Sequence, residues 1–173
     1  MRLRDILLAG VLALGAACAG AQGIKIGFVD GYRIENESVT ALKLIEALKK
    51  EFAPRERQLQ DMQKQVADLQ ARLEKGGAKM KPTEREARER ELNALAQRFE
   101  QARRGFVEDL ELRKREARGK VIEDANIVIK SIAEAEKFDL VLQDAVFHSR
   151  QIDITEKVLK AMAKRPVPPL SGR

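Results

Sequence analysis

Two runs of apolar residues, with spacings that alternate between three and four, flank the pair Gly76-Gly77. This spacing is that of the a and d positions of a coiled coil, which form a narrow apolar seam between charged flanks. The first run consists of Leu59, Met62, Val66, Leu69 and Leu73, and the second of Leu92, Leu95, Phe99, Ala102 and Phe106. Two seams joined by a short turn pair when the chain folds back on itself. The sequence therefore predicts an antiparallel helical hairpin.

The sequence allows two alignments of these seams. One places Leu59 opposite Phe106. The other is shifted by one heptad, places Leu59 opposite Phe99 and Phe52 opposite Phe106, and centres the turn nearer Lys79. Both put apolar side chains against apolar side chains, so the register stays open.

The first helix of the hairpin is predicted to begin after Ser38, a favourable N-cap residue, and to end at Lys75. Pro54 lies inside it. Because a proline removes one backbone hydrogen bond and clashes with the preceding turn, we expect a kink over residues 52–55.

The second helix is predicted to begin with a capping box of Thr83 and Glu86 and to run over residues 84–136. Gly105 and Gly119 lie inside it, and each lowers helix stability by up to about 1 kcal/mol relative to alanine. Its apolar stripe broadens towards the C-terminal end, where it comprises Val121, Ile122, Ala125, Ile127, Val128, Ile129, Ile132 and Ala133. One partner helix cannot bury so wide a stripe, so this end must pack on strands, on other chains, or on both.

Short strands are predicted on either side of the hairpin. Residues 24–29 alternate and are rich in β-branched side chains, and 30–38 form a connection with a helical turn. Residues 139–143 and 145–149 are predicted to form a β-hairpin. A final helix over 153–163 is predicted from the capping-box spacing of its first residues, Asp153 and Glu156.

The predicted fold class is α+β and mostly helical, with a small β core, or body, and a long coiled-coil arm. We expect a single domain over 22–165. Its body comprises 22–53 and 121–165, its arm comprises 54–120, and a flexible tail follows over 166–173. Three short strands make a poor isolated sheet with exposed edges, which favours a homo-oligomer.

Residues 1–21 have the pattern of a secretory signal peptide. A basic start is followed by an apolar stretch over residues 6–19 and by small residues before a cleavage site after Ala21. Cys18 offers an alternative, a lipid-modified N-terminus, but Gly15 stands where such sites favour leucine. We expect export across the inner membrane and a mature chain without cysteine.

The basic excess lies in the arm. Residues 55–120 contain 18 basic and 13 acidic side chains, whereas the rest of the chain from residue 22 onwards contains 13 of each. The ordinary interpretation of such charges is a solvated helix face with intrahelical ion pairs.

No catalytic or cofactor site is expected. His148 is the only histidine and Cys18 the only cysteine, which excludes a Cys/His metal site within one mature chain. Adjacent carboxylates such as Glu108 and Asp109 lie among basic neighbours, and no glycine-rich phosphate loop is present. A basic arm could attach to nucleic-acid phosphates, but export and the lack of interleaved aromatic residues argue against specific nucleic-acid binding.

The order of these segments resembles the Skp/OmpH family of periplasmic chaperones for outer-membrane proteins, over essentially the whole mature chain. The resemblance rests on the strand that ends Gly27-Phe28-Val29-Asp30, on Asn36-Glu37-Ser38 at the start of the first helix, and on the charged hairpin. It also rests on Asp139-Leu140-Val141-Leu142, on Asp153-Ile154-Thr155 and on Val158-Leu159.

This resemblance implies a homotrimer in the periplasm, with three arms around a cavity that holds unfolded outer-membrane β-barrel proteins without ATP. Acidic client segments or anionic lipid, including lipopolysaccharide, would then meet the basic arms. The candidate contact residues are Lys75, Lys79, Lys81, Arg85, Arg103, Arg104, Arg113, Lys114 and Arg115. The alternative function is a structural coiled coil that bridges other components of the cell envelope.

Overall fold

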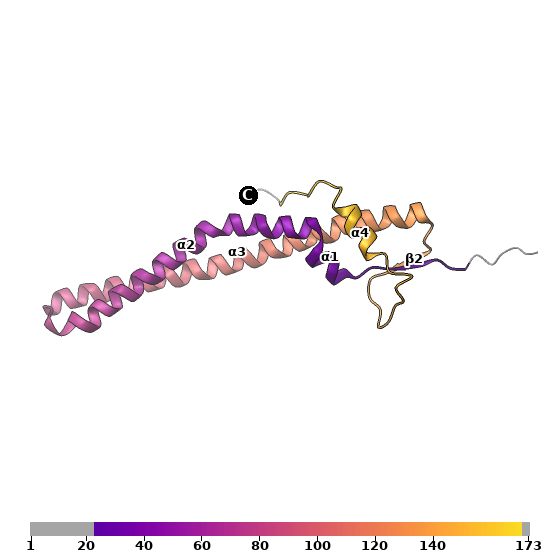
Figure 1. The fold of residues 1–173 in the computed structure, drawn as a ribbon. Helices are drawn as coiled ribbons and strands as arrows, with labels where there is room; N and C mark the ends of the chain where they lie inside the picture. Colours follow the sequence, from indigo (N-terminus) through magenta and orange to yellow (C-terminus); the bar gives the residue numbers. More distant parts are fainter. Residues whose placement is uncertain (1–22, 171–173) are drawn as a thin grey trace, which may run out of the picture.

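A computed structural model describes residues 23–170 (Figure 1). The predicted signal peptide and its cleavage site lie outside the described residues. The elements follow the order β1, α1, α2, η1, α3, β2, α4. Among the described residues, no helix is both long enough and apolar enough to cross a membrane.

Two long antiparallel helices dominate the molecule and confirm the predicted hairpin (Figure 1). Helix α2 (Val39–Gly76) has 38 residues, and helix α3 (Pro82–Glu136) has 55. The 3-10 turn η1 (Gly77–Lys79) joins them. At 1.5 Å per residue, α3 is about 80 Å long, so most of the hairpin projects as an arm beyond the small body.

The two hairpin helices begin in different ways. The Ser38 hydroxyl accepts a hydrogen bond from the Ala41 amide at 3.1 Å, which confirms Ser38 as the N-cap of α2. The predicted capping box at Thr83 is wrong, because α3 begins two residues earlier than predicted, at Pro82, after the N-cap Lys81, which makes no side-chain cap. The fixed φ of proline suits the first helical position, where no amide donor is needed.

Polar contacts between α2 and α3 define the register near the body. Arg55 Nη1 lies 2.9 Å from Asp109 Oδ2, and Thr40 Oγ1 donates to Asp124 Oδ2 at 2.8 Å. Both pairs follow the alignment that places Leu59 opposite Phe106. Phe52 and Phe106, a pair from the shifted alignment, nevertheless meet edge to face with ring centroids 5.5 Å apart. Pro54 lies inside α2 and does not end it.

The sheet has two parallel strands, β1 (Ile26–Phe28) and β2 (Leu140–Leu142). The predicted β-hairpin is wrong, because residues 145–149 form no strand. The other edge of β1 pairs instead with residues 152–154: Phe28 donates to the Ile152 carbonyl at 2.7 Å and accepts from Ile154 at 2.9 Å. The segment that lies along the second edge of β1 is therefore 152–154 and not 145–149.

Two short helices complete the body. Helix α1 (Gly31–Glu37) is capped by the Asp30 carboxylate, which accepts from Arg33 N, so the predicted helical turn is a full helix. Helix α4 (Thr155–Met162) begins two residues later than predicted. Asp153 accepts from the Thr155 amide at 2.8 Å, but Glu156 does not close the capping box, because it pairs with Arg33 at 2.6 Å.

The core lies where the base of the hairpin meets α1, α4 and the strands. Its buried apolar members are Val29, Ile34, Ala41, Leu44, Leu48, Phe52, Ala117, Val121, Ala125, Val128, Ile154, Val158 and Met162. Val167 and Leu170, in the segment expected to be a flexible tail, pack against this core. Ile122 and Ile127 of the broad stripe remain exposed, so one chain does not bury the whole stripe.

A buried carboxylate at the base of the hairpin binds side chains from two other segments of the chain. Asp124, only 4% exposed, accepts from Thr40 of α2 and from Arg165 Nε at 2.8 Å, just beyond α4. We predict that Asp124→Ala lowers the free energy of unfolding by about 1–3 kcal/mol, because the buried Thr40 hydroxyl loses its acceptor and the exposed Arg165 loses its ion-pair partner. The matched control Glu123→Ala changes an exposed residue and should stay within about 0.5 kcal/mol. Urea unfolding of both variants measures this, and equal losses would contradict it.

The glycines of α3 allow a second test. A Cβ atom built at Gly105 or at Gly119 meets no atom within 4 Å, so alanine fits at both positions. We predict that Gly105→Ala and Gly119→Ala each raise the unfolding free energy, by up to about 1 kcal/mol. Thermal unfolding of the single and double variants checks this. A loss of stability would show that these glycines meet a neighbour that the isolated chain lacks.

Candidate functional site

The basic residues predicted to contact clients or anionic lipid fall into three groups along the arm. Lys75, Lys79, Lys81 and Arg85 surround the turn at the far end, and we call them the tip cluster. All four side chains are exposed, and no acidic residue occurs from Lys75 to Thr83. Arg85 alone of the four has an ion pair among the described residues, with Glu89 at 2.8 Å. The fold thus concentrates positive charge at the part of the arm farthest from the body.

The other two groups lie nearer the body. Arg103 and Arg104 are exposed on α3, and Arg103 pairs with Glu100 at 2.9 Å. Lys114 and Arg115 are exposed within one turn of the core residue Ala117, and Lys114 pairs with Glu111 at 2.8 Å. Along α3, Arg103 and Arg104 lie about five turns from Arg85, so the structure does not gather all the candidates into one patch.

Arg113 has a different environment from its neighbours. It is 8% exposed, and its guanidinium holds Glu51 of α2 at 2.9 Å and Glu116 at 2.5 Å. This arrangement joins the two helices, so Arg113 is a structural residue, and we remove it from the candidate contact surface. The neighbouring basic residues in the sequence gave no sign that one of the three side chains turns inward.

Two adjoining hollows on the hairpin, which the sequence analysis missed, add apolar surface where the arm meets the body. Their volumes are about 320 and 350 Å³, and they share Ile45, Leu48 and Lys114. Phe52, Phe106 and Leu110 also line the outer of the two. Because their side chains come from both helices, the spacing along either helix alone does not reveal the hollows.

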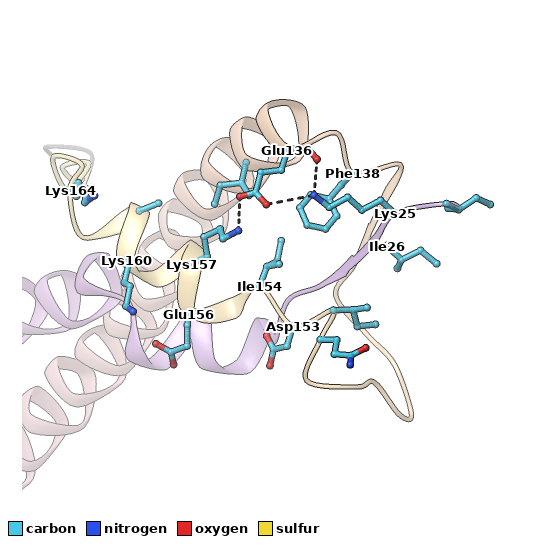
Figure 2. Close-up of a pocket in the computed structure, with 15 residues that line it drawn as sticks. Lys25, Ile26, Glu136, Phe138, Asp153, Ile154, Glu156, Lys157, Lys160 and Lys164 are labelled. Atoms are coloured by element: carbon cyan, nitrogen blue, oxygen red, sulfur yellow. Dashed lines mark hydrogen bonds and ion pairs between the residues drawn. The ribbon is translucent and has the colours of Figure 1, made fainter. Parts of the chain in front are cut away.

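A larger groove, which we call the body groove, lies between the N-terminal strand, the end of α3 and α4 (Figure 2). Its volume is about 970 Å³. Apolar side chains line much of it, namely Ile24, Ile26, Ile132, Phe138, Ile152, Ile154 and Ala161. Four lysines border these residues: Lys25, Lys157, Lys160 and Lys164. The sequence analysis missed this groove too, because the N-terminal strand is more than 100 residues away from the end of α3 and from α4.

Glu136 neutralises one side of the groove. Lys157 Nζ lies 2.5 Å from its carboxylate, and Lys25 Nζ donates to its backbone carbonyl at 2.7 Å while lying over the Phe138 ring (Figure 2). The hydrogen bond from Lys157 lowers the pKa of the Glu136 carboxyl below its ordinary value of 4.5. Lys160 and Lys164 have no ion pair within residues 23–170, so this end of the groove keeps its positive charge.

His148 has a packing role in the structure. Its ring stacks on Phe28 with the centroids 3.8 Å apart, and its Nδ1 atom is buried without a hydrogen-bond partner. No group of three or more potential metal ligands occurs among the described residues.

The lowered pKa of Glu136 has a consequence for stability. A carboxyl whose pKa is lower in the folded state stabilises the fold above its unfolded pKa, near 4.5, and loses that contribution as the pH falls through the folded value. We predict that Glu136→Gln lowers the melting temperature at pH 7 and that the difference from the parent chain disappears well below pH 4.5. Melting curves across this range check the sign, with Glu134→Gln, an exposed residue, as the control. A difference that grows in acid would contradict it.

Comparison with known proteins identifies relatives of this chain by sequence. The family model for outer membrane protein (OmpH-like) matches residues 25–162. "Chaperone protein Skp" of Escherichia coli (strain K12) is 31% identical over 161 residues, covering 91% of this chain and 98% of that protein. "Chaperone protein Skp" of Yersinia enterocolitica is 29% identical over the same length.

A crystallised OmpH-like protein from Caulobacter crescentus superimposes with a TM-score of 0.74, over 87% of this chain and 90% of that one. At 16% identity, this likeness concerns the fold alone. The family match covers most of the chain, and the Escherichia coli relative is aligned over nearly its whole length. This chain therefore belongs to the OmpH-like outer membrane protein family, which includes the Skp chaperones.

Proposed function

We propose that this protein is an ATP-independent holdase chaperone of the periplasm. In this role it binds unfolded outer-membrane β-barrel proteins between its helical arms and keeps them from aggregating. The observation that carries the proposal is the long projecting hairpin with uncompensated positive charge at its tip, in a chain related to proteins named chaperones.

The arm offers two kinds of weak contact to an unfolded chain. The tip cluster attracts acidic segments over a range of about 10 Å at 0.1 M salt. The apolar hollows near the body provide surface for apolar segments that water would otherwise drive together. Many weak contacts spread along a surface hold a client in solution without fixing one conformation, and they need no nucleotide for release.

Holding a whole polypeptide requires more than one arm. The exposed apolar residues of the body, among them Ile24, Ile127, Leu140, Val146 and Phe147, favour self-association. A homotrimer places three arms around one cavity, and this is the state we propose. Anionic lipid, including lipopolysaccharide, is a second proposed ligand of the exposed arm cations, because its phosphates carry the charge that lysine and arginine bind.

The experiment measures aggregation of a urea-denatured β-barrel protein diluted into buffer that contains the purified chain. We expect the client to stay soluble in a complex that sediments with the chaperone, and protection to weaken as salt rises. A stable assembly that leaves the client to precipitate would overturn the proposal. It would favour the alternative function, a spacer in the cell envelope that binds one folded partner with fixed stoichiometry.

A variant with the tip cluster neutralised, Lys75→Gln, Lys79→Gln, Lys81→Gln and Arg85→Gln, tests the role of its charge. We expect several-fold weaker protection and a smaller salt dependence. The matched control neutralises four exposed lysines near the body, with Lys43→Gln, Lys50→Gln, Lys130→Gln and Lys137→Gln, so that both variants have the same net charge. Equal losses in the two variants would show that total charge matters and the tip cluster does not.

A further inference from the structure

A proline-rich segment follows α4, over residues 165–170, and we call it the strap. The family match ends at residue 162, so the strap lies outside it. In Figure 1 the chain leaves α4 and turns back along the hairpin, in the direction of the arm. Val167 and Leu170 of the strap are half-buried and pack against the core. The strap therefore covers part of the junction between the body and the arm.

The exposure pattern of the strap is that of a polyproline II segment. Proline fixes its own φ and disfavours helical backbone at the residue before it, which leaves an extended helix with about three residues per turn. Val167 and Leu170 are three residues apart and face the core, whereas Pro166 and Pro169, also three apart, are exposed. One edge of the strap thus lies on the protein and another faces water.

An ion pair anchors the start of the strap to the hairpin. Arg165 Nε donates to Asp124 Oδ1 of α3 at 2.8 Å, and Thr40 of α2 donates to the other oxygen of the same carboxylate at 2.8 Å. The backbone amide of Arg165 donates to the carbonyl of Met162, the last residue of α4, at 3.0 Å. The first residue of the strap is therefore joined to α4 and, through Asp124, to both helices of the hairpin.

The composition of the strap suits docking on an apolar surface. A backbone amide that is taken out of water needs an acceptor, but three of the five residues over 166–170 are prolines, which have no amide hydrogen. Their fixed φ angles also reduce the conformational freedom that the segment loses when it docks. The strap can thus lie on the core with few hydrogen bonds, and it can leave the core without exposing many unpaired donors.

We propose that the strap ties α4 to the base of the hairpin and limits how far the arm swings relative to the body. Helix α4 itself packs on the core through the buried side chains of Val158 and Met162. The strap extends this contact towards the arm with two more apolar side chains and the charged anchor of Arg165. When the strap detaches, the arm gains freedom to tilt. This inference depends neither on client binding nor on the number of subunits.

A distance between two spin labels measures the swing directly. The labels are attached at Lys64→Cys in the arm and Lys160→Cys in α4, two exposed positions, in a chain with Cys18→Ser. A large excess of unlabelled chain ensures that both labels of a measured pair belong to one chain. We expect Val167→Ser with Leu170→Ser to widen the distance distribution at least about 1.5-fold, because the apolar edge of the strap no longer docks.

Two further variants separate the docked edge from the change of sequence as such. The matched control Val167→Ile with Leu170→Met keeps the edge apolar and should keep the parent distribution. Arg165→Gln removes the ion pair but leaves the apolar edge in place, so we expect a smaller widening than in the double serine variant. A double serine variant with the same distribution as the parent chain would overturn the proposal.

Hydrogen exchange distinguishes a strap from a general contribution to stability. In the double serine variant we expect the amides of residues 117–128, at the base of the hairpin, to exchange about tenfold faster, and those of 59–73 in the arm to keep their rates. Equal acceleration in both segments would contradict the strap, because it would mean that the whole fold had lost stability. Circular dichroism checks that the helices persist. Client aggregation is measured separately, so the holdase proposal stands or fails on its own result.

Discussion

The packing of α2 against the C-terminal half of α3 is the interaction on which the rest of the molecule depends. A helix about 80 Å long cannot bury its apolar stripe alone. It does so here only where Leu44, Leu48 and Phe52 of α2 meet Ala117 and Val121, and where α4 closes the remaining side. The body is thus the part of the chain with a real core. The arm beyond it is a two-helix hairpin whose side chains stay largely in contact with water.

Charged residues near the body differ in the same way from those at the tip of the arm. Near the body, Arg113 and Asp124 are buried, and each is held by partners from other segments. At the tip, Lys75, Lys79 and Lys81 are exposed and face no acidic neighbour in the turn. The buried charges fix how the helices meet, whereas the exposed ones remain available for ligands.

The body has a core of its own, but it is too small to bury all of its apolar side chains. Its sheet has two strands of three residues, and a sheet of that size leaves Ile26, Leu140 and Leu142 exposed on one of its faces. Ile24, Val146 and Phe147 are exposed as well, and burial of these side chains gives a physical reason for subunits to associate. Assembly and client holding would then use separate parts of the chain, the body and the arm.

The sequence by itself determined the hairpin, the start of α2 at Ser38 and the excess of charge along the arm, because periodicity, capping and charge are local properties. The sequence left the register open, placed Arg113 with the exposed cations, and predicted a β-hairpin from residues 139–149. Only the tertiary structure decided these points. The edge of β1 is paired with residues 152–154, and Arg113 turns towards Glu51, 62 residues away, both through contacts that no local pattern contains. The body groove depends on tertiary structure for the same reason: its walls come from both ends of the chain, which meet only in the folded protein.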